Sequence, residues 1–340
     1  MRELIDLQLK LFPDLVHVMQ RRYQLLHFIQ LMEPIGRRAL AESSNLAERT
    51  VRSEVDFLQE IGLIDITSKG MNVTREGKQL IQQFGEIMKE MSGIRVLEKK
   101  ISETLNIGHV IIVSGDSDHQ PWAKQEMGRA CVNYLKSILK ESRTIAVTGG
   151  SSMAAVAEMM NPTEVPEGCL FVPARGGLGE QVENQANTIC AEMAKKARGK
   201  YRLLYVPDPI SEESYQSMIE EPSIKEVLEV IRKPDVVIHG IGEAITMATR
   251  RRTNEQDMKK IHERQAVGES FGYYFDKQGE IVHRARTVGL QWDDLPKVNH
   301  VIALAGGKSK AAAILSYFKK GFSDVLITDE GSAIEILEQI

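Results

Sequence analysis

Two short segments combine paired glycines with hydroxyl and lysine side chains, each directly after an apolar run typical of a strand. The first is Gly149-Gly150-Ser151-Ser152, and the second runs from Gly306 to Lys310. Glycines let a backbone approach a ligand closely, and exposed N–H groups at a helix start bind phosphate well beside hydroxyls and a lysine. Either loop alone could be a tight turn, but the pair predicts a ligand with two anionic groups.

A third glycine-rich loop, Pro173 to Gly179, contains Arg175. This arginine could bind a phosphate through two parallel hydrogen bonds, and Gln185, on the helical segment that follows, could hold a sugar hydroxyl. Arg250 begins a run of three arginines. Such a run more often marks a solvated face than a ligand site.

Other chemistries fit the spacing less well. Gly307-Lys308-Ser309 resembles the end of a nucleotide-binding P-loop, but Ile302 stands where that motif requires a glycine. No nucleophile elbow occurs, and the histidines lack metal-ligand spacing, so we expect no metal, and His239 is expected to be a core or loop residue. The segment Gly115 to His119 could hold an acid–base cluster, as could Glu269, although turn and capping roles suit that segment better.

Apolar runs recur along the chain from residue 109 onward, and most are followed by a segment of helical period. The strand candidates are 109–113, 144–148, 170–172, 201–206, 235–239, 301–305 and 325–328. Strands that alternate with helices indicate parallel pairing with right-handed crossovers. We expect a doubly wound α/β sheet with ligands outside the carboxyl ends of its strands.

The segment from Pro34 to Gly62 indicates two short helices with a turn at Asn45, a residue that tolerates the left-handed conformation. A two-stranded hairpin pattern follows, and Thr74 can cap a further helix. A helix pair followed by such a hairpin is typical of a winged helix-turn-helix module that binds double-stranded DNA.

The second helix of this module has two chemically different faces. Val51, Val55 and Leu58 share one face, whereas Arg49 and Arg52 lie on the opposite one. Arginine can neutralise phosphate and pair with guanine edges in the major groove. The residues that we expect to face DNA are Arg37, Arg38, Arg49, Thr50, Arg52, Ser53 and Lys69.

Composition narrows the alternatives. The 340 residues include 43 Lys plus Arg and 47 Asp plus Glu, a net charge of −4, so DNA contact must come from a local basic patch. No apolar run approaches the ~20 residues of a membrane span and no signal peptide is visible, so we expect a soluble, cytoplasmic protein. Cys131, Cys169 and Cys190 are odd in number and widely spaced, which favours buried reduced thiols.

Several segments of the chain together resemble the SorC family of bacterial sugar-responsive regulators. They are Pro34 to Arg38 and residues 114–118, 146–150, 171–180, 184–188, 239–244 and 271–275. The resemblance covers essentially the whole chain. It implies a repressor of a glycolytic operon, with a sugar-phosphate-isomerase-like, Rossmann-type effector domain that binds fructose 1,6-bisphosphate or a related sugar phosphate and needs no cofactor. Ser151 and Ser152 stand where close relatives have threonines.

The resemblance also implies which residues contact the effector, and it adds Arg250 and Glu269 to those proposed from spacing. The expected effector contacts are Gly149, Gly150, Ser151, Ser152, Arg175, Gly177, Leu178, Gln185, Arg250, Glu269 and Lys310.

The expected organisation is a winged helix with a leading helix at 1–86, a linker helix at 87–108 and an effector-binding and oligomerisation domain at 109–340. Apolar residues recur every three or four positions between Ile87 and Leu105, and leucines recur at Leu4, Leu7, Leu11 and Leu15. One winged helix cannot cover both stripes, so we expect a homo-oligomer, from dimer to tetramer.

Two rival interpretations use the same fold. The chain could be a sugar-phosphate isomerase or deaminase with an appended DNA-binding module, because fold does not decide function. It could also be a constitutive DNA-binding scaffold whose glycine loops are empty turns. We expect a regulator that is not an enzyme and has no catalytic residues.

Overall fold

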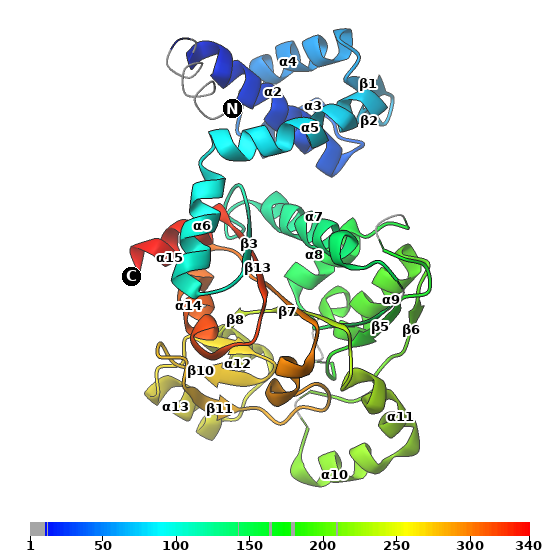
Figure 1. Cartoon of the computed structure of the whole chain (residues 1–340), viewed down its shortest axis with the longest axis vertical. Coiled ribbons are helices and arrows are strands. Elements are labelled where there is room, and N and C mark those ends of the chain that lie inside the picture. Colours follow the sequence, from blue (N-terminus) through cyan, green and yellow to red (C-terminus); the bar gives the residue numbers. More distant parts are fainter. Residues whose placement is uncertain (1–10, 12, 142, 163–164, 178–180, 209) are drawn as a thin grey trace. The chain divides into compact units, whose positions relative to one another are not determined.

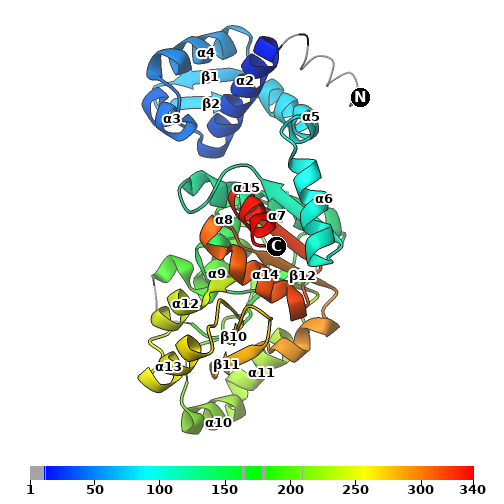
Figure 2. The same ribbon diagram turned by 90° about the vertical axis from the view of Figure 1, so that its left-hand side faces the viewer.

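The computed structural model describes residues 11, 13–141, 143–162, 165–177, 181–208 and 210–340. They form two compact units, of which the first ends at Val96 and the second begins at Leu97. Figures 1 and 2 show the elements of each unit from two directions.

The first unit is the predicted winged helix. It contains helices α2 (Pro13–Met32), α3 (Arg37–Ser44), α4 (Glu48–Glu60) and α5 (Arg75–Met91), and strands β1 (Ile64–Thr67) and β2 (Gly70–Val73). The two strands pair antiparallel as the wing. Asn45 adopts the left-handed conformation (φ 53°) between α3 and α4, as predicted. The Thr74 hydroxyl accepts a hydrogen bond from the Gly77 amide at 3.1 Å and caps α5, as also predicted.

The single linker helix predicted over residues 87–108 is wrong. The structure has two helices there, because α5 ends at Met91 and α6 (Ile94–Leu105) begins three residues later. Gly93 lies between them at φ 75°, a left-handed conformation that glycine adopts without steric cost and that ends a right-handed helix.

A seven-stranded parallel sheet forms the centre of the second unit. Its strand order is β3-β13-β12-β7-β4-β5-β6. The strands are β3 (His109–Val113), β4 (Thr144–Val147), β5 (Leu170–Pro173), β6 (Lys200–Tyr201), β7 (Val236–Gly240), β12 (His300–Leu304) and β13 (Val325–Asp329). The central strands are buried on both faces, which explains their unbroken apolar runs in the sequence. The doubly wound α/β fold is confirmed.

Helices cover both faces of this sheet (Figures 1 and 2). One face carries α7 (Pro121–Ile138), α8 (Ser151–Met159) and α9 (Ala186–Lys196), and the other carries α14 (Ala311–Lys320) and α15 (Glu330–Glu338). The remaining helices are α10 (Glu212–Glu220), α11 (Pro222–Ile231), α12 (Ala244–Arg250) and α13 (Glu255–Glu263), with short 3-10 turns at Val182–Asn184, Trp292–Lys297 and Lys308–Lys310.

A second, antiparallel sheet lies beside the carboxyl ends of the parallel strands, and the sequence analysis did not foresee it. Its order is β11-β10-β9-β8, built from β8 (Gly242–Glu243), β9 (Gly268–Ser270), β10 (Tyr273–Phe275) and β11 (Ile281–Arg284). Strands of two to four residues are too short to show a two-residue period.

The strand predicted over 201–206 is shorter in the structure, where β6 ends at Tyr201. Beyond it, the Asn187 side chain donates to the Leu204 carbonyl at 3.0 Å and accepts from the Leu204 amide at 3.1 Å. This amide side chain pairs the backbone groups that a continued strand would present to a neighbour.

Candidate functional site

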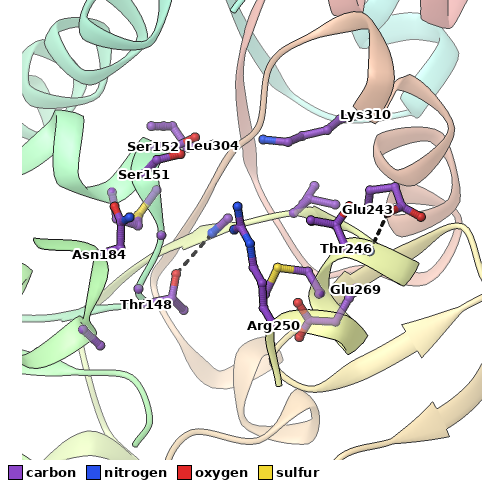
Figure 3. Close-up of a pocket in the computed structure, with 18 of the residues that line it drawn as sticks. Thr148, Ser151, Ser152, Asn184, Glu243, Thr246, Arg250, Glu269, Leu304 and Lys310 are labelled. Carbon is purple, nitrogen blue, oxygen red and sulfur yellow. Dashed lines mark hydrogen bonds between the residues drawn. The ribbon is translucent and has the colours of Figure 1, made fainter. Parts of the chain in front are cut away.

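The principal cavity of the described second unit lies at the carboxyl ends of β4, β5, β7 and β12 and has a volume of about 260 Å³ (Figure 3). β4 and β7 are neighbours, but the chain leaves them toward opposite edges of the sheet. The Thr148 hydroxyl at the end of β4 accepts a hydrogen bond from the Gly240 amide at the end of β7, at 3.2 Å. Ligands of doubly wound folds bind at such a change of strand order.

Both predicted glycine loops border this cavity. Gly150 has φ 117° and Gly307 has φ 97°, values that favour glycine. Gly150 directly precedes α8, where Ser151 is exposed and Ser152 is largely buried. Both serines line the cavity, so backbone N–H groups and hydroxyls meet there.

Two carboxylates, Asp118 and Asp329, hold the second glycine loop through hydrogen bonds, and Asp118 also lines the cavity. Asp118 accepts hydrogen bonds from the Ser309 amide at 2.8 Å and from the Ser309 hydroxyl at 2.9 Å. Asp329 accepts from the Gly307 amide at 2.7 Å and from the Ser117 amide at 2.8 Å. The turn and capping role favoured for the segment 115–119 is therefore confirmed.

Four cations line the same cavity: Lys124 on α7, Arg175 after β5, Arg250 at the end of α12 and Lys310 just before α14. Figure 3 shows the Lys310 and Arg250 side chains pointing into the space that Ser151 and Ser152 border. Burial lowers the pKa of Lys310, and the positive charges of Lys124 and Arg250 lower it as well, against the opposite effect of nearby carboxylates. Asp118, Glu243 and Glu269 also line the cavity, but each carboxylate accepts hydrogen bonds from the protein itself. The cations therefore favour an anionic ligand.

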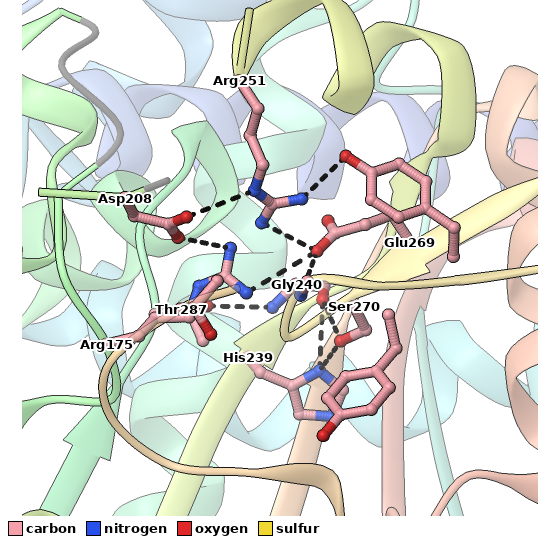
Figure 4. A network of polar contacts seen from close by, with 12 residues as sticks. Arg175, Asp208, His239, Gly240, Arg251, Glu269, Ser270 and Thr287 are labelled. Atoms are coloured by element: carbon pink, nitrogen blue, oxygen red, sulfur yellow. Dashed lines mark hydrogen bonds and ion pairs between the residues drawn. The ribbon is translucent and has the colours of Figure 1, made fainter. Parts of the chain in front are cut away.

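A buried network of two arginines and two carboxylates adjoins the cavity (Figure 4). An Arg175 Nη lies 3.3 Å from Asp208 Oδ2, and its other Nη lies 3.7 Å from Glu269 Oε1. Arg251 donates to Glu269 Oε1 at 2.9 Å and to the Tyr274 hydroxyl at 2.9 Å. Arg175 thus lines the cavity and is already paired with two carboxylates.

His239 lies directly behind this network and is fully buried, as expected of a core residue. Its Nδ1 lies 3.0 Å from the Ser270 hydroxyl, and its Nε2 lies 2.8 Å from the Ser323 hydroxyl and 3.1 Å from that of Tyr317. Burial lowers the pKa of His239 to about 4, so the ring is neutral at pH 7.

The structure brings most of the predicted effector residues to one place. Those that line the cavity are Gly149, Gly150, Ser151, Ser152, Arg175, Gln185, Arg250, Glu269 and Lys310. Gly177 is not among the lining residues, although a Cβ there would lie 3.3 Å from Gln185 Oε1. Leu178 lies outside the described residues. Which of these side chains contact a ligand remains a prediction.

Further lining residues were not singled out from the sequence, among them Lys124, Asn184 and Glu243. The Glu243 carboxylate caps α12 by accepting hydrogen bonds from the amides of Ile245 and Thr246 at 2.9 and 2.7 Å. The Asn184 carbonyl accepts from the Gly150 amide at 2.8 Å. Asn184 and Glu243 lie in segments that carry the family resemblance, whereas Lys124 lies in none of them, and only the fold brings the three residues together.

The first unit presents the predicted polar face of α4. Val51, Val55 and Leu58 are buried, whereas Arg49 and Arg52 are exposed. On the same helix Ser53 is exposed and Thr50 is half-buried, and Lys69 is exposed in the wing.

Two of the expected DNA-facing arginines have partners in the structure. Arg37 pairs with Asp56 of α4 at 2.7 Å, and Arg38 pairs with Glu42 at 3.5 Å. Both pairs are solvent-exposed and therefore weak, so these guanidinium groups can exchange a carboxylate for a phosphate at small cost.

The remaining chemical expectations concern cysteine, metal and membrane. Cys131, Cys169 and Cys190 are free and buried, as predicted. Within the described ranges, no group of three or more His, Cys, Asp or Glu side chains is placed to hold a metal ion. No helix of the described part of the chain is long and apolar enough to cross a membrane.

Comparison with known proteins matches both units. Residues 18–88 match the CggR N-terminal DNA binding domain, and residues 89–338 match the sugar-binding domain family. The chain is 54% identical to the central glycolytic genes regulator of Priestia megaterium over 338 residues, 99% of each chain. It is 53% identical to the regulator of the same name from Bacillus subtilis over 337 residues, again 99% of each chain.

A solved structure agrees with this relationship. The SorC family transcriptional regulator from Enterococcus faecalis superposes with a TM-score of 0.66 at 46% identity, over 71% of this chain and 99% of that one. A matching DNA-binding domain, a matching sugar-binding domain and full-length identity above one half show that this chain belongs to the central glycolytic genes regulators of the SorC family.

Proposed function

We propose that this chain represses a glycolytic operon and releases its DNA when fructose 1,6-bisphosphate, or a closely related sugar phosphate, binds the cavity of the second unit. One observation carries the proposal: Lys124, Arg250 and Lys310 surround a cavity that two glycine loops also border. Cations and helix-start N–H groups are the recurrent partners of phosphate oxygens. The names of the relatives from Priestia megaterium and Bacillus subtilis support control of glycolytic genes.

The arrangement of the loops favours a sugar with two phosphates. Ser152 lies in the first turn of α8 after β4, and Lys310 precedes α14 after β12, with β7 between these strands. A bisphosphate can occupy both loops, whereas a monophosphate occupies one. A charge-assisted hydrogen bond contributes ~1.5–3 kcal/mol, so loss of one anchor should lower affinity ~10- to 100-fold.

The test uses the full-length chain and a DNA duplex that it enriches from a randomised library. Fluorescence anisotropy follows the complex while fructose 1,6-bisphosphate, fructose 6-phosphate or inorganic phosphate is added. Lys310→Gln is compared with Lys308→Gln, which removes the same charge two residues away. Lys308 is a suitable control because its side chain is 52% exposed, pairs with Glu335 and does not line the cavity.

We expect both variants to bind DNA like the wild type without ligand. Lys310→Gln should need ~10- to 100-fold more fructose 1,6-bisphosphate to release DNA, and Lys308→Gln should need the wild-type amount. An unshifted response in Lys310→Gln refutes the anchor, and equal potency of inorganic phosphate refutes a sugar effector. NMR of the recovered sugar should show it unchanged, since the bound sugar acts as a signal.

We also propose that the chain acts in the cytoplasm as a homo-oligomer, from dimer to tetramer, that places two or more winged helices on spaced DNA half-sites. Leu11 and Leu15 of the leading segment support this proposal, because they are 68% and 65% exposed. Sedimentation should show a species larger than the monomer on the DNA. A monomer that saturates the DNA would contradict it.

A further inference from the structure

A buried carboxylate interrupts the apolar face of α4. Glu54 lies between Val51 and Val55 in the sequence and is only 6% exposed. Carboxylates are rarely buried without a partner, because removing their charge from water is costly.

Two consecutive arginines of α2 hold this carboxylate. Arg21 donates to Glu54 Oε1 from Nε at 2.9 Å and from an Nη at 2.6 Å. Arg22 donates to Oε2 from Nε at 2.7 Å. The Arg22 guanidinium also lies over the ring of Phe57, one turn further along α4, at 3.6 Å from its centroid.

Glu54 is ionised at neutral pH. Burial raises the pKa of its carboxyl, but the hydrogen bonds and charges of Arg22 and Arg21 outweigh burial and bring the pKa below its ordinary value. A buried ion pair of this kind adds little stability compared with apolar side chains of similar volume. The pair instead fixes the orientation of α4 relative to α2, because each carboxylate oxygen must meet a particular N–H group.

Both carboxylate oxygens are occupied, so α4 cannot turn about its axis or slide along α2 without breaking a charged hydrogen bond. The side chains of Arg49 and Arg52 leave the same helix on its exposed side, and their direction follows any rotation of α4. We propose that Glu54, held by Arg21 and Arg22, is the positioning residue that sets the rotation of α4 and so orients Arg49 and Arg52 for the bases.

The inference concerns DNA recognition, for which the chain has a matching domain, and it is independent of the effector. Sequence-specific and non-specific DNA binding depend on the rotation of α4 to different degrees. Base-edge hydrogen bonds need exact side-chain direction, whereas phosphate contacts depend mainly on charge. A rotated α4 should therefore lose operator affinity and keep most of its affinity for unrelated DNA.

The experiment compares Glu54→Gln with Glu60→Gln in the full-length chain. Both changes remove one negative charge from α4, but Glu60 is exposed. Affinity is measured for the duplex enriched by the wild type and for a shuffled duplex of the same length and composition. The ratio of the two affinities is the readout, because a smaller folded fraction would weaken both by the same factor and leave the ratio unchanged.

We expect the ratio to fall ~10-fold or more in Glu54→Gln and to stay at the wild-type value in Glu60→Gln. A folded Glu54→Gln with an unchanged ratio, with folding judged by circular dichroism, would overturn the inference. If Glu54→Gln does not fold, Arg21→Lys decides, since it keeps the charge and loses the two-pronged contact. A lower ratio in that variant supports the positioning role, and an unchanged ratio refutes it.

Discussion

Acidification should destabilise the second unit through one histidine. His239 is fully buried at the end of β7, where hydroxyls of Ser270, Ser323 and Tyr317 surround its ring. Burial holds its pKa at about 4, whereas an exposed histidine of the unfolded chain titrates at ~6.5. The folded chain therefore keeps this ring neutral in a pH range where the unfolded chain protonates it.

The sign and size of the effect follow from proton linkage. Between about pH 6.5 and about pH 4 the unfolded chain binds one proton that the folded chain does not, so the free energy of unfolding falls as the pH falls. Each pH unit in this range removes ~1.4 kcal/mol. The whole interval removes about 3 kcal/mol, and the contribution of His239 is fully present above pH 6.5.

The assay is urea unfolding followed by tryptophan fluorescence at pH 7, 6, 5 and 4.5. Both tryptophans of the chain, Trp122 and Trp292, lie in the second unit, so the signal reports that unit alone. His239→Gln removes the titrating group and keeps polar atoms in its place. His109→Gln is the control, because His109 is exposed.

Other groups titrate alike in all three proteins, so the difference between their pH profiles isolates His239. The wild type and His109→Gln should lose about 3 kcal/mol more than His239→Gln across the interval. Parallel profiles for the wild type and His239→Gln would refute the reasoning and indicate that the folded chain protonates this ring without penalty.

Two further predictions concern stability. Arg251→Met should lower the free energy of unfolding of the second unit by about 3–5 kcal/mol, because it leaves Glu269 buried without its partner at 2.9 Å. A loss below ~1 kcal/mol in urea unfolding would show that Arg175 compensates. Asn45→Ala should destabilise the first unit by ~1–2 kcal/mol and Asn45→Gly should not, because the residue has φ 53°; equal melting temperatures for the two variants by circular dichroism would contradict this.

The elements that sequence could predict are those with strong local patterns. The parallel strands show unbroken apolar runs because helices cover both faces of the sheet. Helix α4 shows an apolar face with Val51 and a polar face with Arg52. The strands β8 to β11 have no such pattern, since each spans only two to four residues. The break at Gly93 was hidden because the apolar period continues on both sides of it.

The site divides in the same way. The glycine loops and Lys310 were predictable because their chemistry lies in consecutive residues. Lys124 was not, because it comes from α7 and joins the cavity only through the fold. The pairing of Arg175 with Asp208 joins two loops that are distant in sequence, and no motif contains both. The enzyme interpretation, which the fold alone allowed, is wrong because the family consists of transcriptional regulators.

The cavity borders the starts of helices that lie on opposite faces of the sheet, α8 on one and α14 on the other. A ligand that contacts both glycine loops therefore stabilises helices on both faces of the sheet at the same time. Ligand binding can thus affect the outer helical layers of the unit without the movement of a hinged lid. Amide hydrogen exchange should accordingly slow on both sides of the sheet when the ligand is present, and by linkage DNA must change ligand affinity by the same factor as ligand changes DNA affinity.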